Sequence, residues 1–201
     1  MILYNKEIFN RCFCYRPRYW YKNVVNIPWY FRAIHYLIKN GYDKSATWDM
    51  YMWLIDNARK IMTAYRDNRH GTPIVIEDYK TNDKESDERN EKKWNEIVDR
   101  MIFLLGEMDE NTCQKKNPYD DDSHKIYDEF SKKYGIFGER LNPPEEKDKK
   151  FITMHFPSEL PEYHDTMDKW YAAEREIEEY RSKCKDEFFE LFSKHFYALW
   201  D

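Results

Sequence analysis

A dense run of rings and cations near the N-terminus is the part of this sequence best suited to chemistry. It reads Tyr15-Arg16-Pro17-Arg18-Tyr19-Trp20-Tyr21, and Arg32 follows a short distance later. Aromatic rings stack on nucleobases, and a guanidinium holds a phosphate through paired hydrogen bonds. The candidate ligand-binding residues are therefore Arg16, Arg18, Tyr19, Trp20, Tyr21 and Arg32. The alternative is that these rings only fill the core of the protein.

Histidines and cysteines show no recognisable catalytic or metal-binding spacing. The neighbours His164-Asp165 make a poor dyad, because adjacent helical residues do not face each other. The C-x-C pair Cys12 and Cys14 has no second pair at zinc spacing. Glycine-rich phosphate loops, a nucleophile elbow and a zinc-protease motif are missing too. The sequence gives no reason to assign an enzymatic activity, and we predict no metal and no cofactor.

The acidic triplet Asp120-Asp121-Asp122 invites a calcium interpretation, but the alternating acids and central glycine of a calcium loop are missing. Acids are also ordinary at helix starts. His70 and Gly71 are predicted to end a helix, with Gly71 in the left-handed conformation. No signal-peptide pattern is present, so we expect reduced thiols in a cytosolic compartment.

Charge is distributed unevenly along the chain. Residues 1–45 carry eight Lys or Arg against two Asp or Glu, a net charge of +6, and the remaining 156 residues carry −11. Such a split is typical of contact with nucleic acid, an anionic membrane or an acidic partner. It equally allows the basic segment to pack on the acidic part of its own chain. We predict a basic aromatic N-terminal arm and helix over 1–45 and an acidic helical body over 46–201.

The elements that position these residues are predicted to be helices. Only five glycines occur in 201 residues, which argues against glycine-rich nucleotide-binding folds and turn-rich sandwiches. Apolar residues recur at helical spacing in several segments. The predicted helices cover 26–40, 47–69, 91–109 and 123–135, and a last one begins at Pro161 and keeps its apolar seam to Leu199.

Three of these helices have predicted inward sides. In the helix that starts at Asn26, a broad stripe contains Phe31, Ile34, Tyr36, Leu37 and Ile38, and Arg32, His35 and Lys39 share a basic edge. That edge fits either a phosphate-rich surface or cations that snorkel over a core. The predicted inward residues of 47–69 are Tyr51, Leu54, Ile55, Ala58, Ile61, Met62 and Tyr65, and those of 123–135 are Ile126, Tyr127, Phe130 and Tyr134.

The last helix is long enough to need a special arrangement. It either bends, for example near Ser182, and packs on its own domain, which we favour, or it forms an intermolecular coiled coil. Mild alternation over Lys150–Phe156 allows a two-stranded ribbon with Pro73–Glu77. The predicted fold class is mainly α: a single-domain helical bundle with a long C-terminal helix, to which this small β-ribbon is an optional addition.

Four islands of the sequence resemble small accessory proteins of tailed bacteriophages. They are Gly41-Tyr42-Asp43 with Thr47-Trp48-Asp49, the run Arg66–Pro73, the run Trp94–Ile102 and the ending Phe192–Asp201. The resemblance covers about a third of the chain and carries over no functional residue, because the group has no established activity. It implies a protein made in an infected bacterial cytoplasm, either outside the virion or as a minor virion component.

Together these observations predict a non-enzymatic phage accessory binding protein. It would counter a host defence by holding a host protein or by sequestering a nucleotide signal. One alternative is a structural or assembly protein that forms homo-oligomers through its C-terminal helix. Another is attachment of residues 1–45 to nucleic acid or to an anionic membrane.

Overall fold

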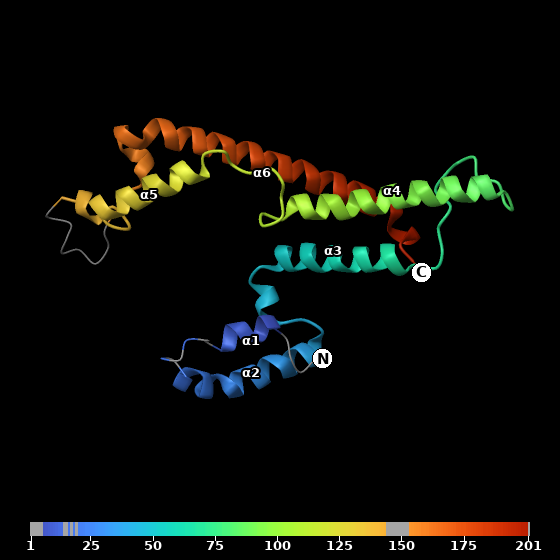
Figure 1. Ribbon diagram of the computed structural model, residues 1–201, viewed down its shortest axis with the longest axis horizontal. Helices are drawn as coiled ribbons and strands as arrows, with labels where there is room; N and C mark the ends of the chain where they lie inside the picture. The colour runs from blue at the N-terminus through green and yellow to red at the C-terminus, as the bar shows by residue number, and fades with distance from the viewer. Residues whose placement is uncertain (1–5, 14–15, 17, 19, 144–152, 201) are drawn as a thin grey trace. The chain divides into compact units, whose positions relative to one another are not determined.

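Apolar residues at helical spacing and few glycines give the described part of the chain a mainly helical structure. The computed structural model describes residues 6–13, 16, 18, 20–143 and 153–200 (Figure 1). The predicted mainly α fold with a long C-terminal helix is confirmed, and no β-strand occurs in these residues. The elements are α1 (Lys6–Cys12), α2 (Trp20–Asn40), the 3₁₀ helix η2 (Lys44–Thr47), α3 (Met50–Asn68), α4 (Lys84–Met108), α5 (Asp120–Tyr134), the 3₁₀ helices η3 (Glu139–Leu141) and η5 (Pro157–Glu159), α6 (Pro161–His195) and the 3₁₀ helix η6 (Phe196–Ala198).

The chain divides into two compact units, Met1–Asn57 and Ala58–Asp201, and α3 begins in the first and ends in the second. In the first unit α1 packs against α2. The buried residues of this contact are Ile8, Tyr30 and Ile34, and Phe9, Cys12, Phe13, Ala33 and Leu37 pack around them. Tyr30 and Ile34 are one helical turn apart, so α1 covers a single side of α2.

The start of α2 differs from the prediction. The helix begins at Trp20 rather than at Asn26, and Pro28 lies inside it. Proline lacks the N–H that a helix interior uses, yet contacts with the α1 region hold α2 on both sides of Pro28. Before it, the Asn26 amide donates to the carbonyl oxygen of Cys12 at 2.7 Å, and after it the ring of Tyr30 packs on Phe13. The Asn26 side chain therefore anchors α1 and does not cap α2.

In the second unit α4 lies antiparallel along the C-terminal half of α6 (Figure 1). The Arg100 guanidinium donates two hydrogen bonds to the Glu187 carboxylate, at 2.7 and 2.6 Å. Nearer the start of α4, the ring of Trp94 meets that of His195 edge-on with 5.6 Å between centroids. The buried side chains of α4 along this contact are Trp94, Val98, Met101, Leu104 and Leu105, and α6 contributes Ile177, Cys184 and Phe188.

The N-terminal half of α6 carries α5, again antiparallel. The Trp170 indole N–H donates to the Asp120 carboxylate at 2.8 Å, and Lys133 donates to Glu162 at 2.9 Å. Phe130 is buried between the two helices, with the partly buried Ile126, Tyr127 and Tyr134 beside it. The predicted inward side of 123–135 is thus confirmed. Helices of its own chain pack along the seam of α6, as in the arrangement we favoured, and α6 is one continuous helix through Ser182.

The first two turns of α4 precede residue 91, where we predicted this helix to begin. The side-chain oxygen of its buried Asn90 accepts hydrogen bonds from the backbone N–H groups of Val75 and Ile76, at 2.8 and 3.3 Å. The side-chain nitrogen of Asn90 donates to the carbonyl oxygen of Pro73 at 2.9 Å. Residues 73–76 therefore pair with a side chain and not with a strand. The predicted ribbon is absent from the described residues, and its positions 150–152 lie outside them.

The predicted left-handed cap at Gly71 is wrong. α3 ends at Asn68, and the φ angle of Gly71 is not among the positive values, which among the described glycines occur at Gly41, Gly135 and Gly138. A Cβ at Gly71 would only touch the Trp200 ring at 3.6 Å, an ordinary contact. Gly41 does end α2 as predicted, with φ of 77° and its N–H on the Leu37 carbonyl at 2.8 Å.

The contact between α4 and α6 yields a stability prediction. Leu104→Ala removes a fully buried side chain, so the free energy of unfolding should fall by roughly 2–5 kcal/mol. Ile61→Ala, on an α3 side chain that is 68% exposed, should change it by about 0.5 kcal/mol or less. Urea unfolding followed by circular dichroism measures both. Equal losses in the two variants would contradict the described packing.

Candidate functional site

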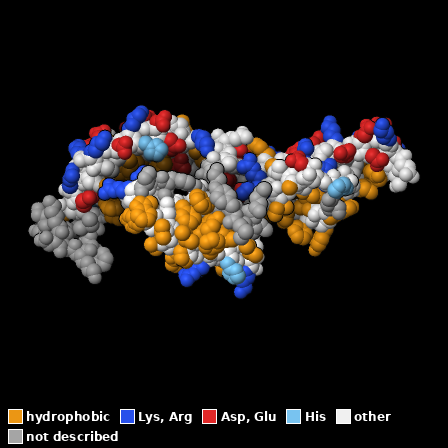
Figure 2. Space-filling model, turned by 60° about the horizontal axis from the view of Figure 1, so that its bottom comes forward, with side chains coloured by type: hydrophobic (Ala, Val, Ile, Leu, Met, Phe, Trp, Pro, Cys, Tyr) orange, Lys and Arg blue, Asp and Glu red, His pale blue; other side chains and the backbone are white. Residues whose placement is uncertain are grey.

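Large apolar side chains stand in solvent on the part of α2 that α1 does not cover. Five of them are Trp20, Val24, Ile27, Phe31 and Ile38, exposed by 67, 55, 43, 61 and 55%, and Tyr21, Val25 and Trp29 are exposed on other sides of the helix. Spacings of four, three, four and seven residues place the first five in one line along the helix, which we call the exposed stripe. Figure 2 shows hydrophobic side chains gathered over α2. The helix is therefore apolar on more of its circumference than its own unit buries.

A basic edge runs beside the exposed stripe. It consists of the exposed residues Arg32, His35 and Lys39, and α2 contains no Asp or Glu. The Arg32 guanidinium lies 5.5 Å from the centre of the Trp29 ring, a cation–π contact. Within the described part of the chain neither Arg32 nor Lys39 pairs with a carboxylate. This edge therefore offers positive charge to a partner.

An open hollow lies on this basic edge and is lined by Phe31, Arg32, His35, Tyr36, Lys39 and Asn40. The Tyr36 hydroxyl donates to the Tyr42 hydroxyl at 3.3 Å. This hydrogen bond, and to a smaller extent burial, raises the pKa of Tyr36. Its hydroxyl stays neutral at physiological pH, so the groups around the hollow are cationic or neutral and suit an anionic ligand.

The six sequence-predicted site residues lie on α2 or just before it. Trp20, Tyr21 and Arg32 are exposed on α2, Arg16 and Arg18 are exposed ahead of it, and Tyr19 lies outside the described residues. Tyr21 and Arg32 lie on similar sides of the helix but about 16 Å apart along its axis. They do not form one clamp around a single nucleotide. They belong instead to a long, open surface.

Sequence reasoning missed most of this surface because it assigned the apolar side chains to the core. Phe31 and Ile38 were predicted to point inward with Ile34, yet only Ile34 is buried. The cause is the length of α1, whose seven residues cover one narrow side of the 21-residue α2. The predicted inward side of α3 is likewise half exposed, with Tyr51, Leu54 and Ile61 in solvent.

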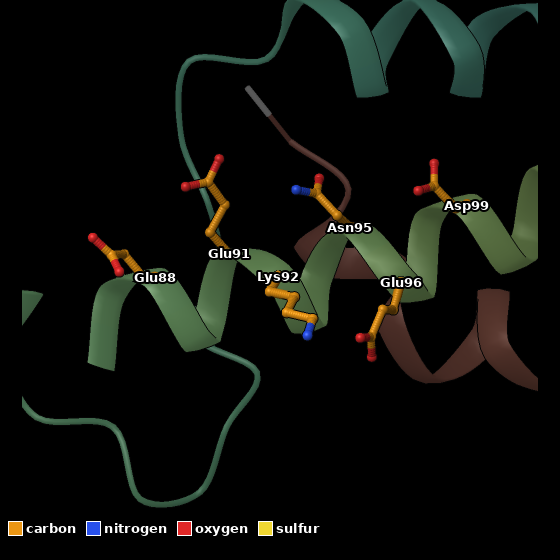
Figure 3. Close-up of a pocket in the computed structure, with 6 residues that line it drawn as sticks. All are labelled: Glu88, Glu91, Lys92, Asn95, Glu96 and Asp99. Carbon is orange, nitrogen blue, oxygen red and sulfur yellow. The ribbon is translucent and has the colours of Figure 1, made fainter. Parts of the chain in front are cut away.

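A second hollow lies on α4 and is acidic. Figure 3 shows its six lining residues, Glu88, Glu91, Lys92, Asn95, Glu96 and Asp99. Glu91, Asn95 and Asp99 point to one side of the helix, and Lys92 and Glu96 point to another (Figure 3). Arg66 also pairs with Asp99 at 2.9 Å. The carboxylates therefore do not converge on a ligand, and this is a solvated helix face.

A buried carboxylate connects α4 with α6. Glu107 is 2% exposed and accepts hydrogen bonds from the Tyr180 hydroxyl at 2.9 Å and the Gln114 backbone N–H at 3.3 Å, with the Cys113 thiol at 3.8 Å. Burial, followed by the bond to Glu107, raises the pKa of Tyr180, and burial raises the pKa of Cys184. Both groups stay protonated at neutral pH. The cluster holds the helices together and offers no thiolate nucleophile.

Two histidines of the second unit, His155 and His164, have structural contacts. His155 meets Glu159 at 2.8 Å through Nδ1 and Asn142 at 3.2 Å through Nε2, so both ring nitrogens are engaged. His164 pairs with Asp168 one turn away at 3.1 Å, and not with the adjacent acid. In the described part of the chain no three potential metal ligands come together.

His195, which is partly buried, packs against Trp94 at the end of α6. Burial, with a smaller contribution from the nearby Lys194 charge, lowers the pKa of His195. The folded state therefore favours the neutral ring, whereas the unfolded chain binds a proton near pH 6.5. Stability from this group is complete above that value and decreases as the pH falls toward the lower folded pKa.

Comparisons with protein-family models, curated proteins and solved structures found no match for this chain. Among the described helices, none combines the length and the apolar character that crossing a bilayer requires.

The buried carboxylate should couple energetically to its tyrosine partner. Glu107→Leu leaves buried donors unpaired and should lower the free energy of unfolding by roughly 1–3 kcal/mol. Tyr180→Phe removes one of those donors. In the double-mutant cycle, the coupling energy from urea unfolding should therefore be roughly 0.5–3 kcal/mol. A coupling energy of zero would contradict the hydrogen bond.

The lowered pKa of His195 predicts a pH dependence of stability. The free energy of unfolding should decrease as the pH falls below about 6.5, and His195→Gln should flatten this part of the profile. Denaturant titrations over this pH range measure the slope. His124→Gln, on an exposed side chain of α5, is the matched control and should leave the slope unchanged. Parallel profiles for the wild type and His195→Gln would refute this role.

Proposed function

We propose that this chain is a non-enzymatic binding protein whose docking surface is the exposed stripe of α2 together with its basic edge. The observation that carries the proposal is the exposure of five large apolar side chains in one line on a helix that already buries another side. Contiguous apolar surface of this kind on a folded protein marks an interaction site. A partner that covers the stripe removes this surface from water.

The energetic gain on docking is substantial. Burying a Val, Ile or Phe side chain fully contributes roughly 1.5–3 kcal/mol relative to leaving it in water. The stripe offers Val24, Ile27, Phe31 and Ile38 at once, with the indole of Trp20 at its end. The cations of the basic edge add a preference for an anionic partner.

The chemistry of this surface supports binding and not reaction. Arg32 and Lys39 are permanent cations, and α2 supplies no carboxylate to act as a general base. His35 stands in the hollow beside rings and cations. Such groups attract and hold an anionic surface. They form no nucleophile–base pair.

We place this binding in the cytoplasm of an infected bacterium. The support is the resemblance of four sequence islands to accessory proteins of tailed bacteriophages. In that setting the protein counters a host defence by occupying a host component. Assembly through α6 has less support, because Ile177, Cys184 and Phe188 of its seam are already buried within the chain.

The proposal predicts that the exposed stripe contributes little to folding. Val24→Ser and Ile38→Ser should each change the free energy of unfolding of the full chain by about 0.5 kcal/mol or less. Ile34→Ser, on a neighbouring side chain of α2 that is 2% exposed, should lower it by at least about 2 kcal/mol. Denaturant unfolding followed by circular dichroism compares the three. Losses at Val24 and Ile38 as large as at Ile34 would mean that the stripe belongs to the core, and the proposal would fail.

A further inference from the structure

We propose that the partner of the exposed stripe is the surface of an anionic lipid bilayer. α2 would lie along the interface, with the stripe among the first carbons of the acyl chains and the basic edge among the headgroups. This inference rests on the proposed function, because it needs the stripe to be free in the folded protein. The inference adds the chemical identity of the partner that covers the stripe.

The residue types in the stripe favour lipid over nucleic acid. Single-stranded nucleic acids bind proteins by stacking their bases on aromatic rings and by contacts between their phosphate backbone and cationic side chains. Val24, Ile27 and Ile38 make up most of the stripe, and these branched aliphatic side chains have no π face on which a base can stack. Hydrocarbon, in contrast, accommodates any apolar shape. Trp20, at the N-terminal end of the stripe, adds an indole ring, which prefers the boundary between headgroups and acyl chains.

The arrangement around the helix fits a protein lying on a membrane. At 100° per residue, Arg32 and Lys39 project about a quarter turn away from the stripe residues Phe31 and Ile38. With the stripe facing the acyl chains, these cations stand level with the headgroups and reach the phosphates by snorkelling. The contact with α1, through Tyr30 and neighbouring residues, lies on the side of the stripe away from the basic edge, so it leaves the stripe accessible.

Charge selects an anionic surface. α2 carries Lys22, Arg32 and Lys39 and no acid, and the exposed Arg16 and Arg18 precede it. The first unit as a whole has eight Lys or Arg against four Asp or Glu. Each basic residue near an anionic leaflet strengthens binding about fivefold, and salt weakens the attraction. A zwitterionic bilayer offers the stripe the same hydrocarbon but no such gain.

The test uses the full chain and vesicles of two compositions, phosphatidylcholine alone and phosphatidylcholine enriched in phosphatidylglycerol. Co-flotation gives the partition coefficient at low and high salt. The wild type should bind the anionic vesicles at low salt and much less at high salt or to phosphatidylcholine alone. Arg32→Gln with Lys39→Gln should reduce partition roughly 20-fold or more. Val24→Ser with Ile38→Ser should reduce it about tenfold or more.

The matched control is Lys92→Gln with Lys93→Gln, which removes the same charge from the exposed surface of α4 and should leave partition within about twofold. Equal binding to both compositions would overturn the anionic selectivity. A second outcome would overturn the lipid assignment in favour of a nucleic acid. In it, the Val24 and Ile38 variants still bind vesicles, and a single-stranded oligonucleotide competes this binding away. A protein that binds no vesicles at low salt would overturn the inference. If the stripe variants still leave the free energy of unfolding unchanged, the proposed function stands, with a protein as the partner.

Discussion

The second unit depends on one seam, the antiparallel contact of α4 with α6. Trp94, Val98, Met101, Leu104 and Leu105 are each exposed by 1% or less, so the apolar side of α4 is almost wholly removed from water. Two polar contacts fix the register of the seam. Arg100 pairs with Glu187, and Glu107 pairs with Tyr180. On each helix the two residues involved are seven positions apart, which is close to two full turns. A slip of one helix along the other would break both contacts and deprive the buried Glu107 of its partner on α6.

The first unit lacks an equivalent seam, and this difference gives rise to the candidate site. α6 is long enough to cover two helices, whereas α1 has seven residues and covers part of one side of α2. The apolar side chains that remain on α2 exceed what this unit can bury. Beside them lie cations and no acids. The same shortage of partner surface that limits the core of this unit thus provides a basic, apolar surface for binding.

The sequence predicted which segments are helical far better than which sides are buried. Periodicity identified α3, the later turns of α4, α5 and α6, since apolar spacing is a local property. Burial of a given side depends on a partner helix that spacing does not specify, so Phe31 and Ile38 were wrongly placed inward. The first turns of α4 were missed because Ser86 and Asn90 are buried through hydrogen bonds to a preceding segment. Of the candidate site, Trp20, Tyr21 and Arg32 were found from residue type, but the stripe between them was not.

The most direct test of the account is the environment of the exposed stripe in the full-length chain. An environment-sensitive fluorescent amino acid in place of Ile27 would report it, with the same probe in place of Lys92 on α4 as the reference. The account predicts water-like emission at position 27 in the free protein and a shift to apolar emission on anionic vesicles, with no shift at position 92. Apolar emission at position 27 before any vesicle is added, or water-like emission after binding, would contradict it.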